Sequence, residues 1–181
     1  PSLSRPNLTW VLGDPTLELR GGDGSLIKSN DNWQDDPAQA TLIQATGIPP
    51  QNNLESAIVA TVNPGPYTAI MRGKNATSGV GLVEVYDLDR TVNSVLANIS
   101  TRAFVRTGDN IVIAGFILGN GGGMDNIIVR GVGPSLITAG VPNALADPTL
   151  PLRDVNVMLL IRNQDRQVIE SQAPNITAAG P

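Results

Sequence analysis

The sequence contains no cysteine and no histidine. Without cysteine, the chain has no disulfide, no thiolate metal site and no cysteine nucleophile. Without histidine, it also lacks the commonest general base and the commonest metal ligand of proteins. Most familiar hydrolase mechanisms are therefore excluded, and we do not expect an enzyme.

Basic and aromatic residues are scarce. The chain has 12 Lys and Arg against 16 Asp and Glu, a net charge of −4, and no basic run. Nucleic-acid binding, which needs clustered positive charge, is therefore not expected.

The longest apolar stretch, Ile111 to Leu118, is too short to cross a bilayer, so we expect no membrane insertion. Because aromatics make up only 3% of the chain, its core must consist of Val, Ile, Leu and Ala. The start, without Met or a charged-then-apolar leader, is typical of a mature or excised segment.

The chain contains an internal repeat. Residues 1–48 align without a gap with residues 134–181, at a constant offset of 133. The clearest matches are Asp14 to Leu17 with Asp147 to Leu150. Identical residues occupy 18 of the 48 aligned positions, where chance would give about 3. The sequence therefore contains about 1.4 copies of a 133-residue unit.

Alternating polar and apolar residues predict half-buried strands at Thr16 to Arg20 and at Tyr67 to Arg72. Further strands are expected at Ser56 to Val62, Val80 to Tyr86, Asn110 to Leu118, Asn126 to Arg130, Pro148 to Arg153 and Val157 to Ile161. Only Ala38 to Ala45 has a helical pattern. Many short strands separated by turns predict an all-β fold, a jelly-roll-like or immunoglobulin-like antiparallel β-sandwich.

Seven motifs spread over nearly the whole chain carry a family resemblance. They are Gly133-Pro134-Ser135-Leu136, Ala144 to Leu150, Asn30 to Gln34, Ala45 to Pro50, Glu55 to Thr61, Val83 to Leu88 and Leu96 to Arg102. Together they resemble a β-repeat found in tandem in large secreted or surface proteins of environmental bacteria. Two segments, Asp14 to Trp33 and Tyr67 to Tyr86, are more loosely similar to bacterial pre-peptidase C-terminal β-sandwich domains. Those domains are auxiliary to enzymes, so the resemblance implies an extracellular, non-catalytic module.

The resemblance also implies a division of the chain. The family unit opens near the Leu96 motif and closes near the Val83 motif, so the order here is rotated. Residues 1–90 match a unit without its opening third. Residues 91–181 hold the opening third of the next unit and the partial second copy. That copy departs from the pattern where Asn30 to Trp33 is replaced by Asn163 to Arg166.

An oxygen-rich cluster is the candidate metal site: Asp23, Asn30, Asp31 and Asn32. Ca²⁺ prefers carboxylate and carbonyl ligands, and some pre-peptidase domains, which the chain resembles, bind it. The spacing matches no EF-hand loop, however, and turns stabilised by Asn and Asp side chains explain the same residues. Trp33 is either an anchor of its turn or a platform for a sugar. No cofactor besides Ca²⁺ is expected.

Other motifs have simpler explanations. The acid pairs Asp35/Asp36 and Asp87/Asp89 have the residue type that glycoside hydrolysis uses, but they also fit a loop start and a strand end. The glycine runs Gly119 to Gly123 and Gly131 to Gly133 lack the lysine and the helix of a phosphate-binding loop, and they predict turns. Asn-x-Ser/Thr sequons at Asn7, Asn75, Asn98 and Asn175 are compatible with a secreted surface.

These features predict a non-catalytic structural β-protein of the cell surface, a subunit of a head-to-tail filament or part of a tandem stalk. A Ca²⁺- or carbohydrate-binding adhesion module is the alternative. Residues 134–181 duplicate residues 1–48, which already occupy the corresponding place in a sandwich. The strands of residues 134–181 therefore need another partner. We expect them to pair with a neighbouring subunit and to bury Leu150, Leu152, Leu159 and Ile161. Deleting residues 134–181 should then leave a folded monomer.

Overall fold

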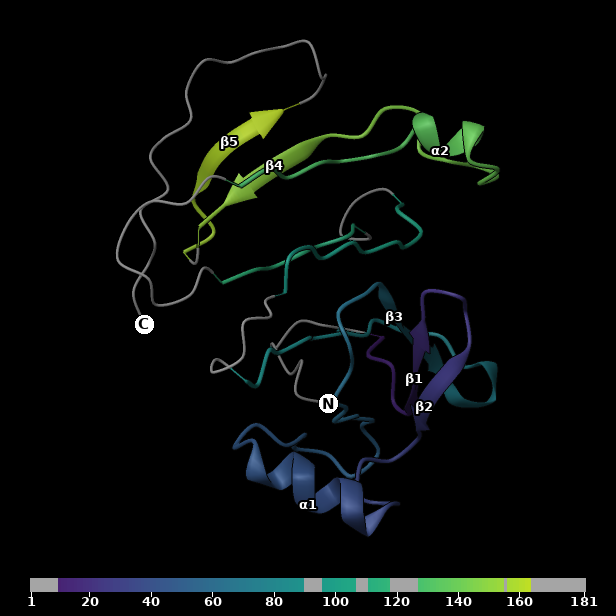
Figure 1. Cartoon of the computed structure of the whole chain (residues 1–181). Coiled ribbons are helices and arrows are strands. Elements are labelled where there is room, and N and C mark those ends of the chain that lie inside the picture. The colour runs from purple at the N-terminus through teal and green to yellow at the C-terminus, as the bar shows by residue number, and fades with distance from the viewer. Residues whose placement is uncertain (1–9, 90–95, 107–110, 118–126, 155, 164–181) are drawn as a thin grey trace. The chain divides into compact units, whose positions relative to one another are not determined.

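The computed structural model describes residues 10–89, 96–106, 111–117, 127–154 and 156–163 (Figure 1). The chain divides into two compact units, an N-terminal unit, Pro1–Ile99, and a C-terminal unit, Ser100–Pro181. The described strands form small antiparallel sheets, and the described helices are few and short. The coarse all-β class expected from the sequence is therefore confirmed.

A three-stranded antiparallel sheet in the order β2-β1-β3 belongs to the N-terminal unit (Figure 1). β1 (Pro15–Gly21) and β3 (Tyr67–Gly73) coincide with the two strands predicted from alternating residues. The sequence analysis did not predict β2 (Leu26–Asn30). The glycine-rich turn at residues 21–24 was its signal, because such turns join the two strands of a hairpin.

One helix follows β2, and it confirms the helix predicted at residues 38–45. This helix, α1 (Pro37–Ala45), begins after Asp36, whose carboxylate accepts hydrogen bonds from the backbone N–H groups of Ala38 (2.9 Å) and Gln39 (3.3 Å). A side-chain oxygen at this position satisfies amides that have no partner inside the helix. Proline at the first helical position fits because its missing N–H would be unpaired there anyway.

The hydrophobic core of the described residues consists of Leu12, Trp33 and Ile43, each at most 6% exposed. Leu12 precedes β1, Trp33 follows β2, and Ile43 lies on α1. Gln39, also on α1, is buried, and its side-chain oxygen accepts a hydrogen bond from the Val59 N–H at 3.1 Å. All of these residues belong to the N-terminal unit. The described residues of the C-terminal unit contain no buried hydrophobic side chain.

The C-terminal unit contains α2 (Ser135–Thr138) and a hairpin of β4 (Leu150–Arg153) and β5 (Leu159–Asn163). This hairpin has the same register as the β1–β2 hairpin. The pairs Leu17–Asn30, Glu18–Ser29, Leu19–Lys28 and Arg20–Leu26 recur as Leu150–Asn163, Pro151–Arg162, Leu152–Ile161 and Arg153–Leu159. Every pair is shifted by the 133 residues of the sequence repeat. A bulge also recurs, since the register slips by one residue at the same place in both hairpins.

The turns of the two hairpins also match. The backbone bond from Gly21 N to Ser25 O (3.0 Å) recurs from Asp154 N to Met158 O (3.1 Å), and the side-chain bond from Arg20 Nη1 to Gly24 O recurs from Arg153 Nη1 to Val157 O, both at 2.8 Å. The two carbonyl acceptors, Gly24 and Val157, both have a positive φ, of 83° and 64°. The hairpin geometry is therefore kept although the turn residues have changed.

Val157 is strained in this turn. Its φ of 64° lies in the left-handed region, which costs an L-residue roughly 1–2 kcal/mol, whereas its counterpart Gly24 enters that region freely. We expect Val157→Gly to stabilise the β4–β5 hairpin by about 0.5–1 kcal/mol, because the relief of this strain exceeds the loss from the freedom that glycine gains in the unfolded chain. Amide hydrogen exchange of β4 measures this change. Gly24→Val is the matched control and should speed exchange in β1, so a Val157→Gly chain with unprotected β4 amides would contradict the prediction.

Four of the strand predictions are wrong for the residues that the structure describes. Residues 56–62, 80–86, 111–117 and 127–130 form no strand, apart from an isolated bridge between Val80 and Val11. In the first segment, the N–H groups of Ala57 and Val59 donate to the side-chain oxygens of Asn30 (3.0 Å) and Gln39 (3.1 Å). Side-chain acceptors thus replace a strand ladder there. In the others, an apolar pattern is present, but no described strand pairs with it.

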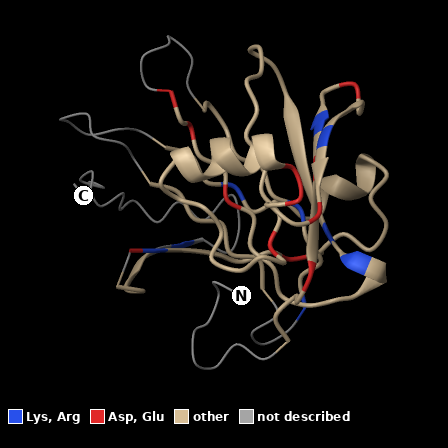
Figure 2. Cartoon of the chain, turned by 90° about the horizontal axis from the view of Figure 1, so that it is seen from below, with Lys and Arg blue, Asp and Glu red and all other residues tan. Residues whose placement is uncertain are grey.

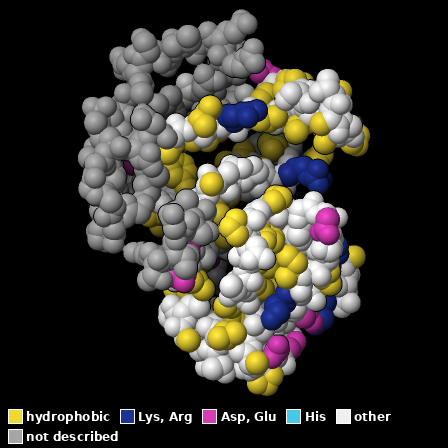
Figure 3. All heavy atoms as spheres, in the orientation of Figure 1, with side chains coloured by type: hydrophobic (Ala, Val, Ile, Leu, Met, Phe, Trp, Pro, Cys, Tyr) yellow, Lys and Arg dark blue, Asp and Glu magenta, His cyan; other side chains and the backbone are white. Residues whose placement is uncertain are grey.

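The surface of the described residues mixes charge and apolar groups. Both acidic and basic residues occur along the described ribbon in Figure 2, and hydrophobic side chains lie at the surface in the view of Figure 3. Several in the C-terminal unit are almost fully exposed, such as Ile117 (93%) and Ile128 (83%). Within the described ranges, no helix has the length and apolarity that a membrane span requires.

Candidate functional site

The four predicted metal ligands lie at two separate places. Asp23 lies in the turn that joins β1 to β2, next to the pair Arg20–Leu26. Asn30 pairs with Leu17 at the other end of the same hairpin, and Asp31 and Asn32 follow it. The structure therefore does not bring Asp23 together with the other three.

Internal hydrogen bonds hold three of these side chains. The Asp23 carboxylate accepts from Ser25 N (2.9 Å) and Ser25 Oγ (2.7 Å), and these bonds lower the pKa of Asp23. Asn30 Nδ2 donates to Asn32 O at 3.0 Å, and Asn32 Nδ2 donates to Asp35 Oδ2 at 3.0 Å. These are the turn-stabilising bonds that were the alternative to a metal site.

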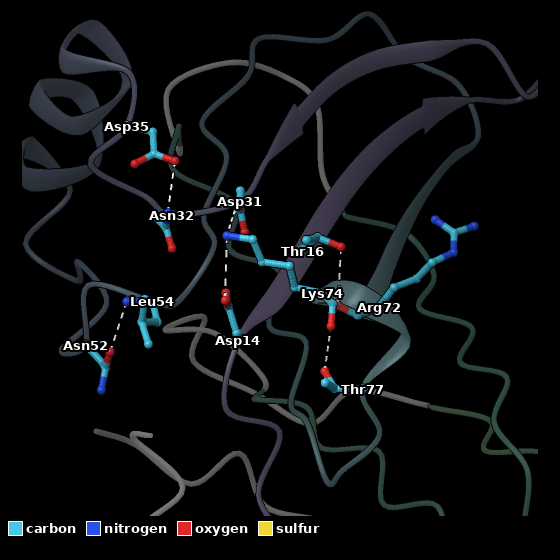
Figure 4. Close-up of polar contacts among 10 residues, drawn as sticks. All are labelled: Asp14, Thr16, Asp31, Asn32, Asp35, Asn52, Leu54, Arg72, Lys74 and Thr77. Atoms are coloured by element: carbon cyan, nitrogen blue, oxygen red, sulfur yellow. Dashed lines mark hydrogen bonds and ion pairs between the residues drawn. The ribbon is translucent and has the colours of Figure 1, made fainter.

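The fourth predicted ligand, Asp31, belongs to an ion-pair cluster with Asp14 and Lys74 (Figure 4). Lys74 Nζ lies 2.6 Å from Asp31 Oδ2 and 3.6 Å from Asp14 Oδ2. The Lys74 backbone N–H also donates to Asp14 O at 2.9 Å. The hydrogen bond with Asp31 is the main cause that raises the pKa of Lys74. The cluster therefore ties together the residue before β1, the residue after β2 and the residue after β3.

Asp14 and Lys74 were not predicted as partners of Asp31. Their only signal was position, since each lies at the end of a predicted strand: Asp14 before Thr16–Arg20, and Lys74 after Tyr67–Arg72. In an antiparallel sheet the start of β1 lies beside the ends of β2 and β3. A sequence argument that assigned β2 and the strand order would have placed these three side chains together.

Two other oxygens of the cluster, and one of the adjacent Asn32, are unusual. Asp14 Oδ1, Asp31 Oδ1 and Asn32 Oδ1 are buried atoms that accept no hydrogen bond from any described residue. Buried acceptors without a donor cost stability, so the Lys74 ammonium is the group that balances the two carboxylates. Across the described stretches, no group of three or more Asp, Glu, His or Cys side chains could hold a metal ion.

Lys74 should stabilise the N-terminal unit through this cluster. We expect Lys74→Met to lower the thermal unfolding midpoint by a few degrees, because it leaves two carboxylates side by side without a counter-charge. Since the folded pKa of Lys74 is raised, its contribution should be complete below the ordinary lysine value of 10.5 and should disappear as the pH rises above it. Thermal melts from pH 7 to pH 12 measure both effects.

The control for this prediction is Lys28→Met. Lys28 is the other lysine of the chain, and it forms no ion pair among the residues that the structure covers. Equal midpoints for the two variants would contradict a role of the Lys74 cluster in stability.

The residues considered for catalysis have structural contacts instead. Asp35 accepts from Asn32, and Asp36 caps α1. Asp87 accepts from the Asp89 N–H at 3.2 Å. Gly133 faces the Leu145 carbonyl oxygen so closely that a Cβ could not fit, which explains a glycine there without a ligand. The run Gly119 to Gly123 lies outside the described residues.

The predicted subunit interface maps onto the β4–β5 hairpin. Leu150 and Leu152 on β4 are half-buried, and Leu159 on β5 is 46% exposed. Ile161 pairs with Leu152 across the two strands. The structure therefore corrects one step of the sequence argument, because β4 and β5 pair with each other within the chain.

Glu18 marks the main difference between the two hairpins. Its carboxylate accepts from Arg20 Nε (2.9 Å) and lies 3.1 Å from Arg72 Nη1 on β3, and these two arginines lower the pKa of Glu18. An ion pair thus links β1 to β3. The residue at the matching position of β4 is Pro151, which can form neither this pair nor a backbone donor bond.

Comparison with known proteins gives no relative: no protein-family model, no curated protein and no solved structure matches this chain.

Proposed function

We propose that this chain is a non-catalytic structural protein of an extracellular assembly, either a filament subunit or part of a tandem stalk. Its units are jelly-roll-like or immunoglobulin-like antiparallel β-sandwiches built from a 133-residue repeat, and its subunits join by β-strand addition. One observation carries the proposal. The β1–β2 hairpin recurs as the β4–β5 hairpin in the same register, but among the described strands only β1 has a third strand beside it.

The exposed apolar surface of the C-terminal unit supports an assembly role. Its described residues include Phe104 (73%), Ile113 (80%), Ile117 (93%) and Ile128 (83%), and none of these described residues is a buried hydrophobic one. Monomeric proteins rarely leave large apolar patches exposed, and such surfaces mark interaction sites. Strand addition uses an open strand edge, and exposed apolar side chains strengthen such contacts.

Electron microscopy of the purified chain tests this function. Negatively stained samples at increasing protein concentration should contain filaments of uniform width, and sedimentation should give a mass that rises with concentration. A chain that stays monomeric at all concentrations and forms no filament would contradict the proposal.

Cation binding is the second candidate, and the three unbonded oxygens of Asp14, Asp31 and Asn32 favour it. The Lys74 ammonium opposes it, because it already lies against both carboxylates. Thermal melting with and without saturating Ca²⁺ separates the two functions. A midpoint that Ca²⁺ raises by several degrees would favour a calcium-dependent adhesion module, and an unchanged midpoint would exclude one.

A further inference from the structure

Lys74 and Asp31 lie at the ends of the two strands that flank β1. Asp31 directly follows β2, and Lys74 directly follows β3. Lys74 Nζ lies 2.6 Å from Asp31 Oδ2, and Asp14 Oδ2 lies 3.6 Å from the same nitrogen. Figure 4 shows the Lys74 amine between the two carboxylates. A lysine amine, a carboxyl carbon that it can attack and a second carboxylate are therefore within reach of one another.

We propose that Lys74 and Asp31 join in an amide bond between Lys74 Nζ and Asp31 Cγ, with Asp14 as the catalytic carboxylate. The reaction takes place once, within the folded chain, and uses no external substrate, so it does not make the protein an enzyme. It goes beyond the proposed function and does not depend on a filament or a stalk.

The bond forms with the loss of one water molecule. A proton first passes from the Lys74 ammonium to Asp31 Oδ2 along the hydrogen bond between them, which leaves a neutral amine and a neutral acid. The amine nitrogen then attacks Asp31 Cγ. Asp14 takes a second proton from the nitrogen and passes it to the departing Asp31 oxygen. The carbon–oxygen bond breaks, water leaves, and Asp14 is again a carboxylate, so the total charge of the three side chains does not change.

The backbone holds the reacting groups in place. The Lys74 N–H donates to the Asp14 carbonyl oxygen at 2.9 Å. The Asn30 side chain, next to Asp31, donates to the Asn32 carbonyl oxygen at 3.0 Å. Groups fixed in this way react as if each were present at a concentration of about 10⁵ M or more. Such proximity favours a condensation that is unfavourable between separate molecules in water.

The surroundings of the two carboxylates also favour the reaction. Asp14 Oδ1 and Asp31 Oδ1 are buried atoms that accept no hydrogen bond from any described residue, so the two negative charges are incompletely stabilised. The amide replaces one of these carboxylates with a neutral group. The side chains of Asp14, Asp31 and Lys74 are 31%, 35% and 37% exposed, so the water that is released can reach the solvent.

The reaction should be slow. The hydrogen bond with Asp31 raises the pKa of Lys74, so the neutral amine is rare. A fresh preparation should therefore consist mainly of the ion-paired chain, to which the pH-dependent melting predicted above applies. The cross-linked chain should accumulate with time.

The amide would strengthen a chain that contains no cysteine and so no disulfide. Because Asp31 and Lys74 lie on either side of β1, the bond ties β2 to β3. It also closes the chain between residues 31 and 74 into a loop, which restricts the unfolded state as a disulfide does. We expect the cross-linked chain to melt at least about 10 °C above the ion-paired chain.

Mass spectrometry of the full chain, fresh and after one week at room temperature, tests the inference. The natural chain should lose the mass of one water molecule. A tryptic digest of the denatured chain should then join residues 29–72 to residues 73–90, because trypsin does not cleave after a modified Lys74. Asp31→Asn should release ammonia in place of water. Lys74→Arg keeps the positive charge but has no nucleophilic amine, so this chain should keep its full mass.

Two further variants test the role of Asp14. Asp14→Asn removes the proton acceptor and should slow the cross-link at least about a hundredfold, in a chain whose circular dichroism shows that it is folded. Lys28→Met is the matched control and should cross-link at the natural rate, because Lys28 forms no ion pair among the described residues. A folded Asp14→Asn chain that cross-links at the natural rate would show that Asp14 is not catalytic.

Three other results would overturn the inference. The first is a natural chain that keeps its full mass throughout the week. The second is loss of water without joined peptides, which succinimide formation would give. The third is a digest in which residues 73–90 are joined to the peptide that contains Asp14. Microscopy scores filaments separately, so either outcome here leaves the proposed function to its own test.

Discussion

Replacing Trp33 with alanine should reduce the free energy of unfolding of the N-terminal unit by about 3–5 kcal/mol. Trp33 is 5% exposed and is the largest of the three hydrophobic side chains that form the described core. Removal of a large aromatic side chain from a core costs its transfer free energy and leaves a cavity. Because whole domains are stable by only about 5–15 kcal/mol, this substitution should remove a large part of the stability of the N-terminal unit. Urea denaturation followed by circular dichroism measures the loss.

The chain provides a matched control in its second tryptophan. Trp10 is 82% exposed, so Trp10→Ala should change the free energy of unfolding by no more than about 0.5 kcal/mol. Trp33→Phe refines the test, because the Trp33 Nε1 is buried without a hydrogen-bond partner. Phenylalanine keeps most of the apolar surface and removes that unsatisfied donor, so its cost should be well below that of alanine. If Trp33→Ala and Trp10→Ala were equally stable, Trp33 would not be a core residue.

The sequence predicted those features of the fold that depend on local patterns. Alternation predicted β1 and β3, and the helical pattern of residues 38–45 predicted α1. The repeat placed two related segments 133 residues apart, and the structure contains the same hairpin in both. These predictions succeeded because strand alternation, helix caps and turn glycines act within a few residues.

The expected strands that failed depended on distant partners. Residues 56–62 have a strand-like sequence, but the side chains of Asn30 and Gln39 take their amide hydrogen bonds. A local sequence pattern does not show that the Asn30 side chain accepts a hydrogen bond from the Ala57 amide, 27 residues away. The same limit applies to the candidate site. Asp31 was predicted as a calcium ligand, and its actual neighbour, Lys74, lies far along the chain on the other side of β1.

Replacing Leu150 and Leu152 together with aspartate should abolish filaments. Both side chains are half-buried on β4, which among the described strands pairs with β5 alone. Strand addition would remove the new carboxylates from water without a counter-charge, and burying an unpaired charge costs several kcal/mol. We therefore expect at least a tenfold drop in the mass of polymer that sediments. The N-terminal sheet should keep its stability, because its hydrogen bonds and core lie within residues 10–81.

A matched control has to add the same charge at the same spacing elsewhere. Val83 and Val85 are two residues apart, are 43% and 54% exposed, and form no strand. Val83→Asp/Val85→Asp should therefore leave the filaments intact, whereas a general effect of added negative charge would remove them in both double variants.

Deleting residues 134–181 is the more drastic form of the same experiment and should leave a folded monomer. Filaments that survive the Leu150→Asp/Leu152→Asp change would show that assembly does not use β4, and an N-terminal sheet that unfolds in this variant would show that the two hairpins depend on each other.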